Sequence, residues 1–302
     1  MASVTALADR HVRTQQARSK AAARRVLREW RRIDPRNIAA SWRALVPRAL
    51  VVVADAQLAG AQGSQDYVTA ALAAQGIDTD AAGTVVPQAF AGTASDGRDL
   101  AGLLYEPAIT ALTLIKRGAP PRAALSAGRQ HLEVIARTQV ADAGRVAGGV
   151  AVTAEPKVGY VRMLELPSCS RCVLLAGKFY RWSQGFQRHP QCDCQHIPAR
   201  EDAAGDLRTD PKAYFESLSE SEQNKVFTAA GAQAIRDGAD MNQVVNARQG
   251  MYTAAGRKLT RYSTGKRGVV RGTRLLPEQI YIEANGNRAE AQRLLRRFGY
   301  LR

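Results

Sequence analysis

The sequence predicts a mainly α fold in three parts: a helical N-terminal half, a small α+β module and a basic helical C-terminal part. Apolar residues recur at intervals of three and four through the first half. From Gly148 the composition changes towards β-favouring residues interrupted by Pro156 and Pro167, and all four cysteines lie between positions 169 and 194. The predicted boundaries are 1–150, 151–200 and 201–302. At 302 residues and 45% hydrophobic content, the chain can bury a substantial core.

The first two predicted helices cover residues 21–30 and 38–58. In the first, apolar side chains share one side and arginines the other at about 100° per residue. The dipeptide Asp34-Pro35 ends it, because the residue before proline disfavours the helical conformation. The second has a continuous apolar stripe and a bend or restart at Pro47.

Three further helices complete the predicted bundle. The pattern continues over residues 67–74, and the segment 76–97, rich in Gly, Ala, Thr and Asp, is predicted to be an irregular connection. A helix follows over 100–116 with a restart after Pro107. The last extends from 121 to about 143 and starts at a proline, whose missing N–H does no harm there.

The composition changes near residue 150. Val150, Val152, Val158 and Tyr160 favour strands, which predicts the start of the α+β module. Helix signals return beyond Pro198. The predicted helix starts are Ser219 with Glu222, Asp240 with Gln243, Pro277, and Asn287 with Glu290.

Positive charge is concentrated at the two ends of the chain. The net charge is +16, and residues 1–50 hold twelve Arg or Lys against three acids. Residues 241–277 contain no acid and several glycines, which predicts an exposed arm. Such basic segments favour a polyanion or an acidic protein surface as partner, although a solvated face is the alternative. The predicted contact residues are Arg24, Arg28, Arg31, Arg32, Arg257, Lys258, Arg261, Lys266, Arg267, Arg271 and Arg274.

A cluster of thiols and imidazoles predicts a structural Zn²⁺ site. Cys169 and Cys172 form a Cys-x-x-Cys pair, which can direct two thiolates at one ion. Four of six candidates would bind the metal: Cys169, Cys172, His189, Cys192, Cys194 and His196. Reduced thiols without metal, and redox or catalytic chemistry, are the alternatives. Because a module of about fifty residues buries little apolar surface, zinc would staple it together.

The same segment resembles a known family. Residues 172–179, Cys-Val-Leu-Leu-Ala-Gly-Lys-Phe, and 189–194, His-Pro-Gln-Cys-Asp-Cys, resemble the core of the MuF-like phage head morphogenesis proteins. That family typically has His-x-x-Leu-Asp-Gly-Lys-Val-Phe and a closing His-Pro-Asn-Cys-Arg-Cys. This chain has Cys172 in place of the His, Ala176 in place of Asp, Gln191 in place of Asn and Asp193 in place of Arg. Residues 232–240 and 244–248 are also similar to minor head proteins of actinobacteriophages.

The resemblance implies a structural minor capsid protein of a tailed phage. It would reside in the virion, inside the capsid at the portal vertex, and in the host cytoplasm during assembly. The implied partners are portal and capsid proteins, with double-stranded DNA as a further partner. Proteins of this lineage are often labelled capsid maturation proteases, so a protease is the main alternative and a metal-dependent nuclease the second.

Sequence motifs decide little about enzymatic activity. No Gly-x-Ser-x-Gly is present, and nothing pairs Ser95 or Ser126 with a base. A nuclease of the His-Asn-His type would need a further His or Asn on a helix after the cluster, and no histidine follows His196. No membrane partner is expected, because the apolar run 49–54 is closed by Asp55.

Overall fold

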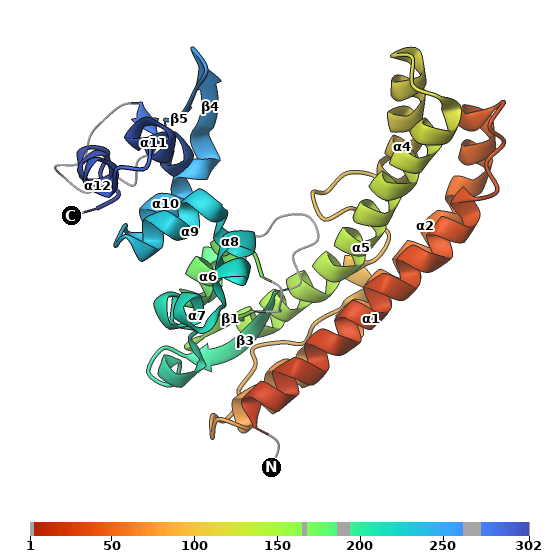
Figure 1. Ribbon diagram of the computed structural model, residues 1–302. Helices are drawn as coiled ribbons and strands as arrows, with labels where there is room; N and C mark the ends of the chain where they lie inside the picture. Colours follow the sequence, from red (N-terminus) through yellow and green to blue (C-terminus); the bar gives the residue numbers. More distant parts are fainter. Residues whose placement is uncertain (1–2, 165–167, 186–193, 262–272, 302) are drawn as a thin grey trace. The chain divides into compact units, whose positions relative to one another are not determined.

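The computed structural model confirms the mainly α fold and adds two small three-stranded antiparallel sheets (Figure 1). The structure describes residues 3–164, 168–185, 194–261 and 273–301. The chain divides into two compact units, Met1–Glu165 with Phe179–Arg208, and Leu166–Lys178 with Thr209–Arg302. The division at residues 150 and 200 stays a prediction of the sequence.

In the residues that the structure describes, the first unit contains five helices and one sheet. The helices are α1 (Val4–Trp30), α2 (Ile38–Gln62), α3 (Ser64–Ala73), α4 (Leu100–Lys116) and α5 (Pro121–Ala154). A short 3₁₀ turn, η1 (Pro87–Phe90), interrupts the connection before α4. The sheet comprises β1 (Val158–Met163), β2 (Phe179–Arg181) and β3 (Gln195–Arg200), with the 3₁₀ turns η2 (Trp182–Gln184) and η3 (Gly205–Leu207). β1 is the central strand.

Helix α5 is the central element of this unit. It contacts each of the other four helices and also β1 and β3, and Figure 1 shows it running alongside α1, α2 and α4. The sequence predicted its end near residue 143 and strand tendency at Val150 and Val152, and this was wrong. The helix continues to Ala154 because Ala151 and Val152 are buried in a cluster with Val158 and Ile197. Tertiary burial therefore outweighs the β propensity of the two valines.

Two helices contain an internal proline and remain continuous. Pro107 lies within α4, where the sequence predicted a restart, and Pro47 lies within α2. The indole Nε1 of Trp42 donates a hydrogen bond to the carbonyl oxygen of Leu104 at 2.9 Å, in the turn before Pro107. This bond satisfies a carbonyl in the turn that the proline disturbs.

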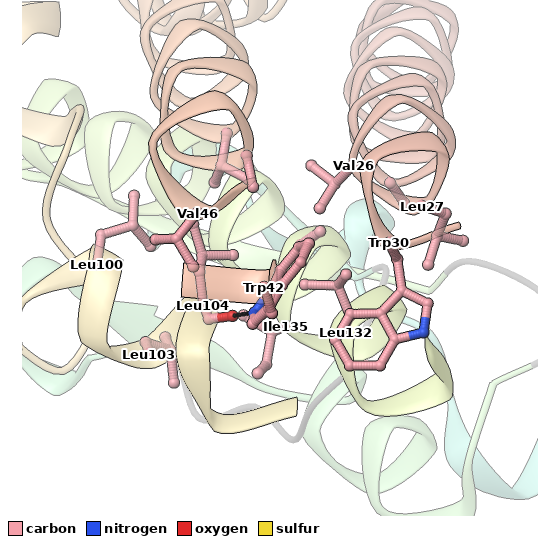
Figure 2. Packing of buried hydrophobic residues seen from close by; sticks show 14 of the residues in the cluster. Val26, Leu27, Trp30, Trp42, Val46, Leu100, Leu103, Leu104, Leu132 and Ile135 are labelled. Atoms are coloured by element: carbon pink, nitrogen blue, oxygen red, sulfur yellow. Dashed lines mark hydrogen bonds between the residues drawn. The ribbon is translucent and has the colours of Figure 1, made fainter. Parts of the chain in front are cut away.

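The largest apolar cluster lies between α1, α2, α4 and α5 (Figure 2). The rings of Trp30 and Trp42 pack edge to face with centroids 4.9 Å apart. Leu100, Leu104 and Leu132 are fully buried around them. Residues 38–73 are long and apolar enough to cross a membrane by length and composition alone, a property that core helices of water-soluble proteins share.

The described part of the second unit contains seven helices and the other sheet. The helices are α6 (Ser170–Ala176), α7 (Pro211–Ser217), α8 (Glu220–Phe227), α9 (Ala229–Arg236), α10 (Met241–Ala247), α11 (Pro277–Ala284) and α12 (Arg288–Arg297). The strands are β4 (Met251–Ala254), β5 (Arg257–Thr260) and β6 (Arg274–Leu275), and the 3₁₀ turn η4 (Arg248–Gly250) precedes β4. Part of the predicted exposed arm is therefore an ordered sheet, because Leu275 and Leu276 are buried in the core of this unit.

Local signals placed most helix starts of the second unit correctly. Ser219 and Glu222 form the predicted capping box, with the Glu222 carboxylate accepting from the Ser219 backbone N–H at 2.9 Å. Asn287 caps α12 by accepting from the backbone N–H of Glu290 at 3.1 Å. Asp240 caps α10 through the backbone N–H of Gln243 at 3.0 Å.

A matched pair of glycines on α5 tests the packing of the first unit. A Cβ at Gly128 would lie 2.6 Å from the Trp30 ring and 2.7 Å from the Pro107 carbonyl oxygen, whereas a Cβ at Gly149 would meet no atom within 4 Å. We expect Gly128→Ala to destabilise the protein by about 1 to 3 kcal/mol through overpacking. Gly149→Ala should stabilise it by up to about 1 kcal/mol through helix propensity. Urea unfolding of both variants measures this, and equal effects would contradict the packing described.

Candidate functional site

Cys169 and Cys172, two of the six predicted metal ligands, lie at the start of α6. Cys169 is the N-cap of α6, and its Sγ accepts a hydrogen bond from the backbone N–H of Cys172 at 3.4 Å. This is the turn in which a Cys-x-x-Cys pair presents two sulfurs with backbone donors supporting them. Cys172 is buried and Cys169 is partly exposed. The pair fits one half of a tetrahedral zinc site.

The other predicted ligands are placed differently. Cys194 and His196 belong to the first unit, at the start of β3 and within it, and both are buried. His189 and Cys192 lie outside the described residues. Within the ranges that the structure describes, no group of three or more His, Cys, Asp or Glu side chains is arranged to hold a metal. The four-ligand zinc site therefore stays a prediction.

His196 belongs to a buried polar cluster in the first unit. Arg145 and Asp142, both on α5, form an ion pair of 2.8 Å with exposures of 3% and 1%. The Nε of Arg145 donates to the carbonyl oxygen of Cys194 at 2.9 Å. Burial, and then the guanidinium groups of Arg145 and Arg162, lower the pKa of His196 to about 3. Its imidazole is therefore neutral at pH 7, the form that can ligate a metal.

Sequence reasoning missed this cluster. Asp142 and Arg145 lie three residues apart on a helix, a spacing that also occurs on solvent-exposed faces. The available signal was the run of small residues over 141–152, since a helix with small or apolar residues on all sides is a buried one. Two buried, opposite charges within such a run indicate a buried ion pair.

His11 also differs from the sequence interpretation, which placed it on a helix surface. Its ring stacks on Tyr67 of α3 with centroids 4.0 Å apart and an interplanar angle of 9°. Tyr67 donates a hydrogen bond from its hydroxyl to the carbonyl oxygen of His196 at 2.7 Å. Burial, and secondarily Arg18, lower the pKa of His11 to about 4.

Two of the predicted N-terminal contact residues, Arg24 and Arg28, lie on α1, and the other two, Arg31 and Arg32, directly follow its last residue, Trp30. Arg24, Arg28, Arg31 and Arg32 are all exposed, and Arg32 forms an ion pair with Glu29 at 2.7 Å. The face extends further than the sequence analysis proposed. At about 100° per residue, six exposed cations fall within an arc of about 80°. These residues are Arg10, Arg13, Lys20, Arg24, Arg28 and Arg31, defined here as the α1 basic stripe.

The C-terminal candidates have varied environments. Arg257 forms a two-pronged pair with Glu283, at 2.8 Å for both bonds, and Arg261 lies over the Tyr252 ring at 5.0 Å. Arg274 is fully buried, stacked 4.1 Å from the Tyr300 ring, so its side chain is not part of the exposed surface. Lys258 is exposed. Lys266, Arg267 and Arg271 lie outside the described residues.

The two serines considered for a protease have distinct surroundings. Ser95 pairs with Gln139: its backbone N–H donates to the amide oxygen at 2.7 Å, and its hydroxyl oxygen accepts from Nε2 at 3.3 Å. Ser126 is exposed on α5. A glutamine amide cannot act as the general base that a serine nucleophile needs.

The lowered pKa of His11 predicts a pH dependence of stability. Because its folded-state pKa of about 4 lies below the ordinary 6.5, the unfolded chain takes up the proton first. Stability is therefore lost as the pH falls from about 6.5 towards 4. At pH 5 this loss amounts to about 2 kcal/mol relative to pH 7.5.

Urea unfolding at both pH values, for the wild type and His11→Phe, measures the contribution. Phenylalanine keeps an aromatic ring against Tyr67 and removes the titration, so the variant should lose about 2 kcal/mol less than the wild type on acidification. The assignment to His11 would be refuted by identical losses in the two proteins.

Comparison with known proteins places most of the chain in one family. The VG15 protein family matches residues 1–221 of the 302, which include all of the first unit. No curated protein and no solved structure matches the chain. Since the match covers well over half of the sequence, the chain belongs to the VG15 protein family.

Proposed function

We propose that this protein is a structural minor capsid protein of a tailed phage, of the MuF-like head morphogenesis type. It acts inside the capsid at the portal vertex, where it contacts portal and capsid proteins and packaged double-stranded DNA. During assembly it is present in the host cytoplasm. The motif resemblance over residues 172–194 supports the family type. The α1 basic stripe is the observation that carries the DNA contact.

The stripe has the dimensions of a phosphate-binding surface. Arg10 and Arg31 are separated by about 32 Å along the helix axis, at about 1.5 Å per residue. That length is close to one turn of duplex DNA, about 34 Å. The part of the chain that the structure describes places no carboxylate within ion-pair distance of Arg24, Arg28 or Arg31. Their charges are therefore available to an external polyanion.

Cations on such a face gain affinity mainly by releasing counterions from DNA. Each neutralised phosphate contributes about −0.9 to the slope of log K against log salt. The contact is insensitive to base sequence, because phosphates carry no sequence information directly. A protein that meets whatever DNA is packaged needs this kind of contact and no base-specific one.

Charge reversal on the stripe tests the proposed DNA contact. Arg24→Glu/Arg28→Glu/Arg31→Glu should weaken binding to a duplex of about 20 base pairs at least tenfold near 100 mM salt. The salt slope should fall by about 2 to 3. Fluorescence anisotropy at four salt concentrations gives both quantities, and circular dichroism checks the fold.

A matched control comes from the same unit. Arg117, Arg122 and Arg129 are exposed cations that do not belong to the stripe, in or next to α4 and α5. Reversing these three changes the net charge by the same amount and should cost little affinity. Equal losses in the two triple variants would show that net charge, and not the stripe, governs binding.

The proposal includes a structural zinc ion. Cys169 and Cys172 have the Cys-x-x-Cys turn geometry, which supports this part of the proposal. When bound, zinc would contribute folding free energy on the order of 10 kcal/mol to the segment that carries its ligands. The chain's own residues provide the sulfur and nitrogen ligands that zinc prefers.

Metal analysis tests the zinc ion. We expect about one zinc per chain in protein purified under reducing conditions, measured by mass spectrometry of the metal. Cys169→Ser/Cys172→Ser should lose the zinc and become cleavable by trypsin between residues 160 and 200. Ser170→Ala, which leaves both thiols in place, is the control. Two results together would refute the proposed zinc ion: native protein that contains no stoichiometric metal, and a double variant that resists trypsin as well as the wild type does.

No second function is proposed. The capsid maturation protease and the metal-dependent nuclease were the alternatives from sequence, and the surroundings of Ser95 and Ser126 favour neither.

A further inference from the structure

A pocket of about 270 Å³ lies in the first unit on the C-terminal half of α5. Its walls come from α5, β1, η2 and β3, all parts of that unit. The pocket is distinct from the α1 basic stripe, and one of its wall residues, His196, is also among the six candidate zinc ligands. Its volume is near the lower end of the range for small-molecule sites.

The polar group of the pocket is the guanidinium of Arg145, which is 3% exposed. Two of its nitrogens are satisfied: Nε donates to the Cys194 carbonyl oxygen and Nη1 to the Asp142 carboxylate. The third nitrogen, Nη2, is buried, and none of the described residues accepts its hydrogen bonds. A buried charged donor without an acceptor is unfavourable, so an oxygen supplied from outside would satisfy it.

The remaining walls are largely apolar. Val146, Val150 and Trp182 line the pocket and are exposed by 46%, 42% and 57%. Large apolar side chains gathered in this way are typical of binding surfaces. The Tyr160 ring is fixed, because its hydroxyl donates to the Gly185 carbonyl oxygen at 2.6 Å and the ring stacks on Tyr180. An apolar group would therefore enter a largely preformed site.

Gly149 lies in the pocket wall, within α5. Glycine in a helix interior costs stability relative to alanine. Close packing does not require it here, since a Cβ at this position would meet no atom within 4 Å. Gly128 on the same helix is the contrasting case, where packing excludes any side chain. The absent side chain at Gly149 keeps the pocket open.

The guanidinium of Arg145 favours a carboxylate. An ionised oxygen accepts a shorter and stronger hydrogen bond from Nη2 than a neutral oxygen does. A phosphate dianion fits poorly, because a single guanidinium nitrogen cannot satisfy its three oxygens.

We propose that this pocket binds a carboxylate carried on a small aromatic or branched apolar group. The carboxylate accepts hydrogen bonds from Nη2 of Arg145, and the apolar group contacts Val146, Val150 and Trp182. The same chemistry occurs in a free small acid and in the C-terminal residue of a peptide that ends in an apolar side chain.

Titration with paired ligands tests the proposal. The probes are 3-phenylpropionate as a free acid and acetyl-Ala-Phe as a peptide terminus, each compared with its primary amide. Trp182 is the exposed one of the three tryptophans, so its fluorescence reports binding, and calorimetry confirms it. Each acid should bind at least tenfold more tightly than its amide. The acid that binds more tightly shows whether the natural ligand is a free acid or a peptide terminus.

A pocket-filling variant separates binding from folding. Gly149→Leu should reduce affinity for both acids at least tenfold while its unfolding midpoint stays at or above that of the wild type. Gly149→Ala should retain binding. No saturable binding of either acid, equal affinities for acid and amide, or wild-type affinity in Gly149→Leu would overturn the proposal. These outcomes do not involve DNA or zinc, so they leave the proposed function untouched.

Discussion

The close approach of other helices to α5 is the constraint on which the first unit depends. Gly128 brings the Trp30 ring and the Pro107 carbonyl against the α5 backbone, and Gly144 leaves room for the Gln15 side chain from α1. Because packed interiors are as dense as crystals of small molecules, these contacts leave little room for adjustment. With its neighbours set at these distances, α5 can carry the apolar cluster around Trp42 at one end and the sheet at the other.

The same helix creates the polar centre of the unit. Burial of Arg145 and Asp142 is tolerable because the two side chains neutralise each other at 2.8 Å and Arg145 also reaches the Cys194 carbonyl. An ion pair of this kind contributes less to stability than its geometry suggests, since both groups lose their hydration. Its effect is to tie the residue before β3 to α5, and one guanidinium nitrogen is left without an acceptor among the described residues.

The two proposed contacts depend on different kinds of interaction. On α1, many exposed charges act together. Each one contributes little binding free energy, and salt screens the attraction of all of them to a polyanion. In the pocket on α5, one buried charge acts in a largely apolar setting where each hydrogen bond counts for more. A protein of the head interior could use both, since contact with packaged DNA is unspecific whereas recognition of a carboxylate depends on shape. The stripe and the pocket are independent, so an experiment that disproves one of the two proposed contacts leaves the other unaffected.

The sequence by itself determined the helical class, most helix starts and the basic character of the outer α1 face, because caps, prolines and apolar spacing act within a few residues. Ser219, Pro121 and Asn287 illustrate this. Spacing alone also led to the prediction that Cys169 and Cys172 form a metal-binding pair, and this stays a prediction. Only the tertiary structure decided that α5 continues past residue 143, that His11 stacks on Tyr67, and that Arg145 and His196 line one pocket. Those outcomes depend on burial between segments outside the range of local sequence patterns, and local propensity carries no information about such contacts.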